Sequence, residues 1–285
     1  MLIHDFYKTY KREGLTSHIL KTFQGIIYSY YKRSGRNFPF RRDISPYNVL
    51  ISEIMLQQTQ TSRVADKFLE FINKFPNFNE LANAKTNEIL KVWQGLGYNR
   101  RALALKKIAK IVVNEYEGKL PEDINVLKSF PQIGHNTASS ILTFSFNKPT
   151  YFVETNIRRV YIHFFFRDKN LISDDEILPL VKKTLDFANP REWYYALMDY
   201  GVMLKKTHPE LHKKSTHYRK QAKFEGSNRE IRGKVLKMIL REKNINETEI
   251  FKEVQRDRGT IREILNVLED EGFIKKNGQN YYILE

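Results

Sequence analysis

The sequence contains no cysteine, and this absence removes several kinds of chemistry at once. Without thiols the chain can form no disulfide, no thiolate nucleophile, no cysteine-ligated zinc site and no cysteine-ligated iron–sulfur cluster. Long hydrophobic runs are also missing, since no apolar stretch approaches the ~20 residues that cross a bilayer. Asp5, Lys8 and Lys11 interrupt the N-terminal residues, which is not the pattern of a signal peptide. We therefore expect an intracellular, cytoplasmic protein with no membrane partner.

Acidic side chains are outnumbered, with 33 Asp and Glu against 48 Lys and Arg and a formal net charge of +15. Such a surplus suits a polyanionic partner, because each neutralised phosphate releases counterions and adds affinity. Charge alone does not decide, because ribosomal and membrane-surface proteins are basic too. The 285 residues are 41% hydrophobic and 13% aromatic, enough for roughly two domains with packed cores.

Helical periodicity dominates residues 17–223, with apolar side chains at three- and four-residue spacing in 50–56, 64–75, 102–113 and 141–146. Turn signals separate these segments, and no alternating strand interrupts them. The main body is therefore predicted to be all-α.

A different pattern follows the linker at 225–227. Helical periodicity in 229–243, 248–254 and 260–270 precedes two β-prone runs, 273–276 and 279–284, joined by Asn277-Gly278. Asn-Gly between such runs indicates a hairpin whose type I′ turn needs positive φ twice. Three helices and a hairpin predict an appended winged-helix (α+β) domain at 228–285.

Residues 127–138, LKSFPQIGHNTA, indicate a helix end, a tight turn and a new helix. Gly134 can adopt a left-handed conformation and lets a ligand approach the backbone closely. The helix that follows offers free N–H groups and a positive dipole end to a phosphate. By itself the segment also fits an ordinary connection between two helices.

Four segments together resemble the helix-hairpin-helix DNA glycosylases, in particular the adenine glycosylase (MutY) branch. They are PYNVLISEIMLQQTQ at 46–60, WQGLGY at 93–98, the hairpin at 127–138 and NPREWYYALMDYG at 189–201. These occur in the family's order and spacing, and the resemblance covers about residues 23–201. It implies two helical lobes, one at 46–152 holding the hairpin and one made of 15–45 with 153–224, and a cleft for duplex DNA between them. It also implies a monomeric base-excision-repair enzyme.

Glu53 is the first candidate catalytic residue. It lies in the apolar run 50–56, where an unpaired carboxylate is costly and its pKa should rise, as a general acid requires. The alternative is a Glu on a solvated helix face or paired with a basic neighbour. By resemblance, Glu53 protonates the departing purine and helps to position the attacking water.

The resemblance also implies residues that contact DNA. Gln57 and Gln58 would fill the gap left by the extruded base or contact the opposite strand. Tyr98 would wedge beside the lesion, since an enzyme acting on a stacked base must flip it out. Tyr98 could otherwise be a core aromatic, and Trp93 is assigned to the core. The hairpin contributes the remaining predicted DNA-binding residues, which are Ile133, Gly134, Asn136 and Thr137.

The second candidate carboxylate departs from the family. Where the family has Asp, the segment YFVETNIRRV at 151–160 places Glu154, one methylene longer. By resemblance this carboxylate stabilises the oxocarbenium-like transition state, and Asn156 orients it. Arg158 and Arg159 are interpreted as backbone-contacting or ion-pair residues.

Asn136 stands where bifunctional endonuclease III relatives carry a Schiff-base lysine. An amide cannot form an imine, so the resemblance favours a monofunctional glycosylase that hydrolyses an adenine-type mismatched or damaged base in duplex DNA. Three alternatives stay open: a thymine or uracil mismatch glycosylase, a bifunctional glycosylase/lyase, and a non-catalytic DNA-binding protein.

Most relatives carry a four-cysteine iron–sulfur loop, and its positions fall here on Lys205, His212, Ser215 and Gln221. We expect no metal and no cofactor beyond, at most, a monovalent cation at the hairpin. A metal site at His208, His212 and His217 is the alternative to a basic, phosphate-facing segment. The winged helix stands where the family has a domain that recognises oxidised guanine. Its third helix starts near Arg256, Arg258, Thr260 and Arg262, facing DNA or a protein partner.

Overall fold

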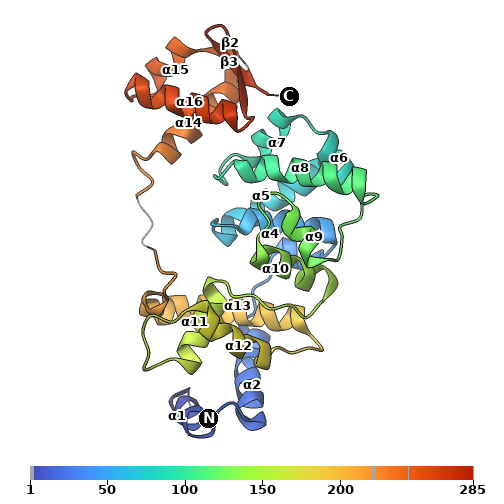
Figure 1. The fold of residues 1–285 in the computed structure, drawn as a ribbon, viewed down its shortest axis with the longest axis vertical. Helices are drawn as coiled ribbons and strands as arrows, with labels where there is room; N and C mark the ends of the chain where they lie inside the picture. Colours follow the sequence, from blue (N-terminus) through green and yellow to red (C-terminus); the bar gives the residue numbers. More distant parts are fainter. Residues whose placement is uncertain (1–2, 220–222, 243, 285) are drawn as a thin grey trace. The chain divides into compact units, whose positions relative to one another are not determined.

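The computed structural model describes residues 3–219, 223–242 and 244–284. The regular elements in these ranges are helices apart from one small C-terminal sheet (Figure 1). The elements, in chain order, are α1 (Ile3–Glu13), α2 (Ser17–Ser34), α3 (Pro39–Arg42), α4 (Pro46–Leu56), α5 (Thr61–Lys74), α6 (Phe78–Asn83), α7 (Thr86–Trp93), α8 (Arg100–Glu115), α9 (Ile124–Ser129), α10 (His135–Phe146), α11 (Thr155–Phe165), α12 (Asp174–Thr184), α13 (Pro190–Thr207), the 3₁₀ helix η1 (Pro209–Lys214), α14 (Asn228–Glu242), β1 (Asn244–Asn246), α15 (Glu247–Glu253), α16 (Arg258–Asp270), β2 (Ile274–Asn277) and β3 (Asn280–Ile283). The all-α prediction for the main body is confirmed.

The described residues form two compact units. The first comprises residues 3–49, 122–129 and 133–219, and the second comprises 50–121, 130–132, 223–242 and 244–284. Both hairpin helices, α9 and α10, therefore fall in the first unit, whereas the turn between them falls in the second. Among the described helices, none is long and apolar enough to cross a membrane.

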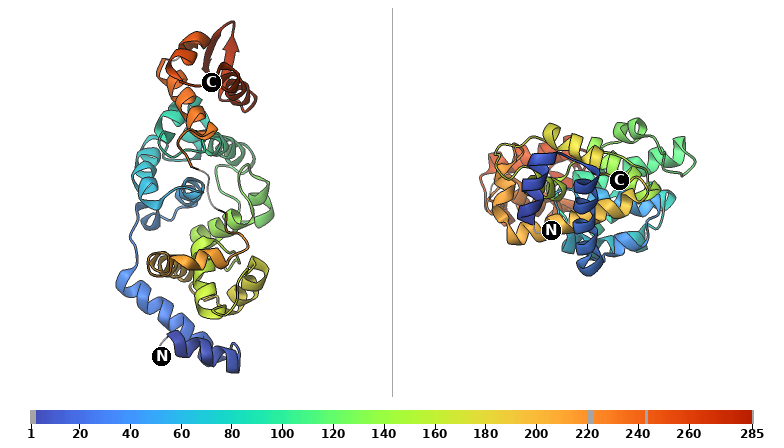
Figure 2. Two further views of the ribbon diagram at one scale, coloured as in Figure 1. Left: turned by 90° about the vertical axis from the view of Figure 1, so that its left-hand side faces the viewer. Right: turned by 90° about the horizontal axis from the view of Figure 1, so that it is seen from below.

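The core of the first unit is aromatic. Helix α2 repeats apolar side chains every fourth residue, so that Ile19, Phe23 and Ile27 share one buried face. Phe23 meets Phe164 of α11 and Trp193 of α13 edge-on, at centroid distances of 5.0 and 5.6 Å. Full burial of each such ring contributes roughly 2–3 kcal/mol. The ribbons of α11 and α13 run side by side in Figure 1 and again in Figure 2.

Helices α5, α7 and α8 form the core of the second unit. Helix α5 buries Val64, Phe68 and Phe71, and Phe71 meets the ring of Trp93 at the end of α7 edge-on at 6.0 Å. Trp93 is fully buried, which confirms its assignment to the core, and its Nε1 donates to the carbonyl of Gly97 at 3.0 Å. That bond fixes the loop at 94–99 directly above the core.

The C-terminal residues carry the predicted three helices and hairpin (orange to red in Figure 2). A short third strand, β1, was not predicted, and the antiparallel sheet has the order β1-β3-β2. The type I′ turn is wrong in detail. Asn277 pairs with Asn280, so Gly278 and Gln279 are the central residues. Only Gly278 has positive φ, at 61°, which is the requirement of a type II′ turn with glycine in the first central position.

Candidate active site

Helix α4 presents Glu53 from an otherwise apolar segment. Leu50, Ile51, Ile54 and Met55 are all buried, as the apolar run predicted. Glu53 itself is half-buried, because the face it occupies is only partly covered. The carboxyl group therefore stands at the margin of a core, where apolar surface lies on one side of it and open space on the other.

The loop that follows α4 is held in a defined shape. Gln57 is half-buried, and its Nε2 donates to the carbonyl of Gln132 in the hairpin turn at 3.1 Å. Gln58 is exposed and has left-handed backbone geometry, with φ at 54°. The two amides that the sequence singled out thus have different placements: Gln57 links two loops of the second unit, and Gln58 projects from one of them.

Arg101 at the start of α8 holds this loop and its neighbour together. Its side chain is only 3% exposed, and its guanidinium donates to six oxygens at 2.6–3.2 Å. The acceptors are the carbonyls of Ile54, Met55, Gln57, Leu96 and Gly97 and the hydroxyl of Thr59. Burial lowers the pKa of Arg101 to about 10, so the group is charged at neutral pH. One cation therefore caps the end of α4 and fastens the loop at 57–59 to the loop at 96–97.

Tyr98 lies at the tip of the second loop. Its ring is 40% exposed, so it is not a core aromatic, and its φ is 46°. The Arg101 guanidinium lies 5.5 Å from the ring centroid, and Arg229 donates to the phenol oxygen at 3.3 Å. The ring is consequently held outward from a strained backbone.

Left-handed backbone geometry marks three loops of the second unit. Gln58, Tyr98 and Gln132 all have φ between 46° and 65°, although none of them is glycine. Such geometry costs of order 1 kcal/mol or more per residue and persists only where the surroundings enforce it. Here the surroundings are the bonds made by Arg101 and Gln57. The loops are therefore built to project particular side chains.

The hairpin has its left-handed residue at a different position from the one predicted. Gly134 has φ −88° and ψ −179°, so it is extended, and Gln132 has the positive φ. A methyl group on Gly134 would meet nothing within 4 Å. The open space above Gly134, rather than its backbone freedom, leaves the start of α10 accessible.

The other hairpin residues divide between the core and the surface. Ile133 is buried, so only its backbone is offered to a ligand, while Thr137 is half-buried at the first turn of α10. Asn136 donates from Nδ2 to the carbonyl of Val153 at 2.9 Å, and the Nε2 atom of His135 lies 3.1 Å from the carbonyl of Tyr151. The start of α10 is therefore tied to the segment that leads into Glu154.

Glu154 is the N-cap of α11. Its Oε1 accepts from the backbone N–H groups of Asn156 and Ile157 at 2.9 and 3.1 Å, and its Oε2 accepts from Asn156 Nδ2 at 3.3 Å. Asn156 in turn accepts from Arg159 Nη1 through its own Oδ1 at 2.7 Å. The half-buried carboxylate is thus fixed by three donors at the start of a helix.

Helix α13 approaches this cap closely at Gly201. A Cβ atom on Gly201 would lie 2.3 Å from the backbone oxygen of Asn156, so no side chain fits there. Two residues earlier, Asp199 is 1% exposed and accepts from Arg36 and Arg41. These contacts secure α13 on the first unit and so hold the start of α11.

The basic segment after α13 packs against α11. Arg158 makes a two-pronged ion pair with Asp174 at 2.6 and 2.7 Å, which confirms its interpretation as an ion-pair residue, and His217 also contacts Asp174, at 3.4 Å. Within the described ranges, no group of three or more histidine, aspartate or glutamate side chains is arranged to hold a metal ion. The histidines at 208, 212 and 217 are therefore not part of such a group.

In the C-terminal helices, the predicted basic residues have partners within their own domain. Arg258 and Arg262 lie over the ring of Phe251 at 5.4 and 5.5 Å, and Arg262 pairs with Glu247. Asp257 caps α16 by accepting from the N–H of Thr260. Helix α16 starts at Arg258.

Comparison with known proteins identifies the fold. Residues 51–185 match the family described as HhH-GPD superfamily base excision DNA repair protein. Over these residues the chain is similar to the HhH-GPD superfamily. Residues 228–285 match a second family, the sugar-specific transcriptional regulator TrmB.

Among curated proteins, the chain is similar to adenine DNA glycosylases. It is 34% identical over 186 residues to that of Buchnera aphidicola subsp. Baizongia pistaciae, covering 64% of the chain and 52% of the relative. It is 31% identical over 192 residues to that of Homo sapiens, covering 63% and 35%. The chain thus spans about half the length of the bacterial relatives it matches.

Solved structures agree with the fold of an HhH-GPD protein. A thermostable thymine-DNA glycosylase has a TM-score of 0.57 and 25% identity, covering 65% of the chain and 86% of that structure. A trapped endonuclease III–DNA covalent intermediate has a TM-score of 0.53 at 19% identity, covering 68% and 88%.

The iron–sulfur cluster of HhH-GPD relatives does not fit the side chains found here. Of the four expected positions, Lys205 lies in the last turn of α13, His212 lies in η1, Ser215 is buried after it, and Gln221 lies outside the described residues. None supplies a thiolate, and the Ser215 hydroxyl accepts from the N–H of His217. The side chains at these positions therefore do not form the ligand set of such a cluster.

The sequence contained unused signals for two residues that the structure brings into the site. Arg101 falls on the buried stripe of α8, four residues before Leu105, and a cation on such a stripe must be paired or hydrogen-bonded. Arg159 likewise falls on the buried face of α11 beside Val160. Neither arginine touches Glu53 or Glu154 in any described hydrogen bond, and both act on the segments that hold those residues.

Proposed function

We propose that the protein is a monofunctional DNA glycosylase that hydrolyses the N-glycosidic bond of an adenine-type mismatched or damaged base in duplex DNA. The single observation that carries the proposal is the cap at Glu154. A carboxylate held by three donors is preorganised, and it needs no rearrangement when positive charge develops on the sugar. The 34% identity to an adenine DNA glycosylase supports the choice of base.

Two carboxyl groups divide the reaction between them. Glu53 in its protonated form gives a proton to a ring nitrogen of the base, and the bond from the sugar carbon to the base breaks. The sugar becomes an oxocarbenium-like cation, which Glu154 stabilises. Water then adds to that carbon and returns its proton to the Glu53 carboxylate, which restores the starting acid.

The loops of the second unit suit the extrusion of a base. A base that leaves the stack opens a gap, which something must fill. Gln58 and Tyr98 are exposed and have left-handed backbone geometry. Arg101 donates to the carbonyls of Gln57 and Gly97, the residues that precede them. The start of α10, open above Gly134, offers backbone N–H groups to a phosphate.

Asn136 supports hydrolysis without strand cleavage. Its amide cannot form an imine with the sugar, and its Nδ2 already donates to the Val153 carbonyl. A bifunctional glycosylase/lyase would need an amine at this place.

A thymine mismatch glycosylase is the second candidate, favoured by the likeness to the solved thymine-DNA glycosylase. The experiment that separates the candidates uses duplexes that differ in one base pair: adenine opposite oxidised guanine, adenine opposite guanine, thymine opposite guanine, and uracil opposite guanine. Each is incubated with the protein and then treated with alkali to cleave abasic sites. Release from the adenine duplexes supports the proposal, and release only from the pyrimidine duplexes supports the second candidate. Duplex binding with no release from any of them would contradict the proposed function.

A further inference from the structure

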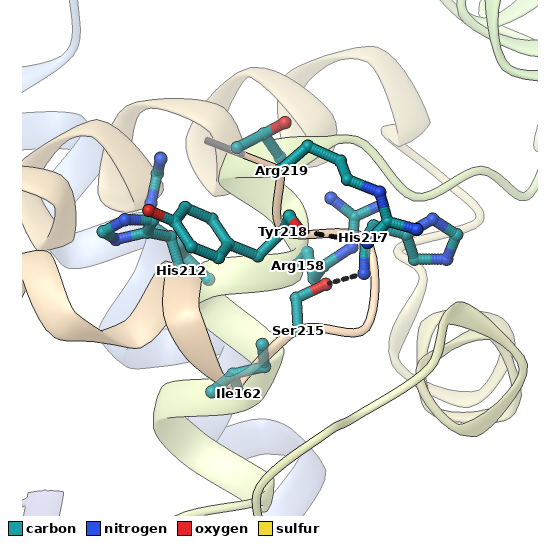
Figure 3. A pocket seen from close by; sticks show the side chains of 9 residues that line it. Arg158, Ile162, His212, Ser215, His217, Tyr218 and Arg219 are labelled. Atoms are coloured by element: carbon teal, nitrogen blue, oxygen red, sulfur yellow. Dashed lines mark hydrogen bonds between the residues drawn. The ribbon is translucent and has the colours of Figure 1, made fainter. Parts of the chain in front are cut away.

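A cavity of about 240 Å³ lies between α11 and the basic segment at 212–219, all within the first unit. Figure 3 shows the side chains that line it, with Arg158 beside the cavity and Arg219 arching over it. The first turns of α11 supply one wall, including Arg158 and Arg159, and Ser215 and Arg219 belong to the opposite wall.

One lining side chain is buried with part of its hydrogen-bonding capacity unused. Arg159 is 8% exposed, and its Nη1 donates to Asn156, but Nε has no acceptor among the described residues. Leaving a buried N–H of a cation unpaired costs on the order of 1–3 kcal/mol. Nε is not accessible from the cavity in this conformation, so an acceptor there reaches it only when the Arg159 side chain turns.

The charges around the cavity favour an anion. Three guanidinium groups line the cavity, those of Arg158, Arg159 and Arg219. Two carboxylates lie near them: Asp174 pairs with Arg158, and Glu154 attracts Arg159. Positive charge is therefore in excess. His212 and His217 add positive charge when protonated. No group of three or more histidine, aspartate or glutamate side chains that could hold a metal ion occurs among the described residues.

We propose that this cavity binds a phosphate group. Planar guanidinium forks match the oxygens of phosphate. Among the residues that the structure describes, the acceptors of Arg219 are the backbone carbonyls of Thr216 and Tyr218, so its side chain can turn toward a ligand. Both a phosphodiester of a DNA strand and free inorganic phosphate have this chemistry.

Ligand binding here would act on the candidate active site through two side chains. Arg159 donates to Asn156, and Asn156 donates to Glu154. A phosphate that fixes Arg159 therefore also fixes the group that orients the Glu154 carboxylate. In most relatives an iron–sulfur cluster loop, with its cysteine thiolates, is expected at this place. The cavity would instead hold an anion between arginine side chains.

The first arm of the test uses inorganic phosphate alone. Thermal unfolding of the full chain is followed in sodium phosphate and in sodium chloride of equal ionic strength. We expect a saturable rise of Tm with phosphate only. Arg219→Gln should raise the apparent Kd for phosphate at least about fivefold, as loss of one charge-assisted contact implies. Arg33→Gln is the matched control, because Arg33 is also exposed, lies in the same unit and donates to a single backbone carbonyl, that of Ser29.

The second arm distinguishes the two phosphate sources with a mismatched duplex. If the ligand is a phosphodiester, inorganic phosphate competes with DNA beyond its ionic strength, and Arg219→Gln lowers the log–log salt slope by about 0.9 relative to Arg33→Gln. If the ligand is free phosphate, both variants bind DNA alike. The first arm needs no glycosylase activity, so its outcome is separate from that of the proposed function. Absence of a saturable phosphate effect, or equal behaviour of the two variants in both arms, overturns the proposal.

Discussion

The side-chain amide of Asn136 donates a hydrogen bond of 2.9 Å to the carbonyl of Val153, the residue that precedes Glu154. The second helix of the hairpin thereby positions the candidate carboxylate through its backbone. We expect Asn136→Ala to slow single-turnover base release by about fivefold, as loss of one hydrogen bond of ~1 kcal/mol implies.

Asn83→Ala is the control for this prediction. Asn83 also donates its amide to a single backbone carbonyl, that of Asn79 at 3.0 Å, but lies on α6. Its release rate should match that of the wild type. Equal rates in both variants would show that Asn136 does not position Glu154.

Glu154→Gln tests the charge of the cap. Gln retains an oxygen that can accept from both backbone N–H groups, so the melting temperature should change little. Base release should lose at least ~3 kcal/mol of transition-state stabilisation, which is more than a hundredfold in rate. Glu154→Asp should give a rate between those of Gln and wild type, because it restores the charge but withdraws it by one methylene. A wild-type rate for the Gln variant would leave Glu154 as a helix cap alone.

Glu53→Gln separates catalysis from binding. The variant should bind a mismatched duplex with wild-type affinity and release no base, since an amide cannot supply the proton. Gel-shift and single-turnover measurements on the same duplex check the two halves. If the variant keeps most of the wild-type rate of base release, Glu53 is not the acid.

Arg101→Lys should destabilise the protein by about 3 kcal/mol in urea unfolding, because an ammonium offers three donors to six buried acceptors. Arg63→Lys is the comparison, since Arg63 is exposed and makes one bond, to the Gly95 carbonyl at 3.3 Å. A difference below 1 kcal/mol between the two variants would contradict a central role for Arg101.

His163 predicts a loss of stability in mild acid. Burial lowers its pKa to about 4 in the folded protein, with contributions from His208 and Arg167 and an opposing one from Glu210. Between pH 6.5 and 4 the unfolded chain therefore binds a proton that the folded chain does not, so stability falls as pH falls. The loss is about 3 kcal/mol by pH 4. His163→Phe should lack this portion of the acid dependence, and an unchanged dependence would exclude His163 as its source.

Periodicity and turn residues predicted the elements of the fold well because those signals are local. The helical main body, the three C-terminal helices and their hairpin all follow from spacing within a few residues. Strand β1 was missed because three residues carry too little pattern. Its strand character comes from pairing with β3, in which Ile245 lies opposite Tyr281 far along the chain.

The candidate site was predicted in its residues but not in its supports. Glu53, Glu154 and Asn156 were found through motif resemblance, and their roles stay predictions. The bonds from Arg101 to two loops, and from Arg159 to Asn156, join residues whose contact no spacing rule anticipates. The left-handed residue of the hairpin was assigned to Gly134 because glycine is the usual choice there. Gln132 adopts that geometry instead, within a turn whose carbonyl binds Gln57.

Position 201 in the first unit accommodates no residue other than glycine. With a Cβ atom due 2.3 Å from the Asn156 oxygen, the separation of α11 and α13 is set by a hydrogen atom. In a library screened only for folded protein, alanine at position 201 should be depleted, whereas glutamine at 154 should survive. Selection for folding would therefore act on Gly201 in α13, and selection for activity would act on Glu154 at the start of α11. A chain that had lost its activity would still preserve the glycine.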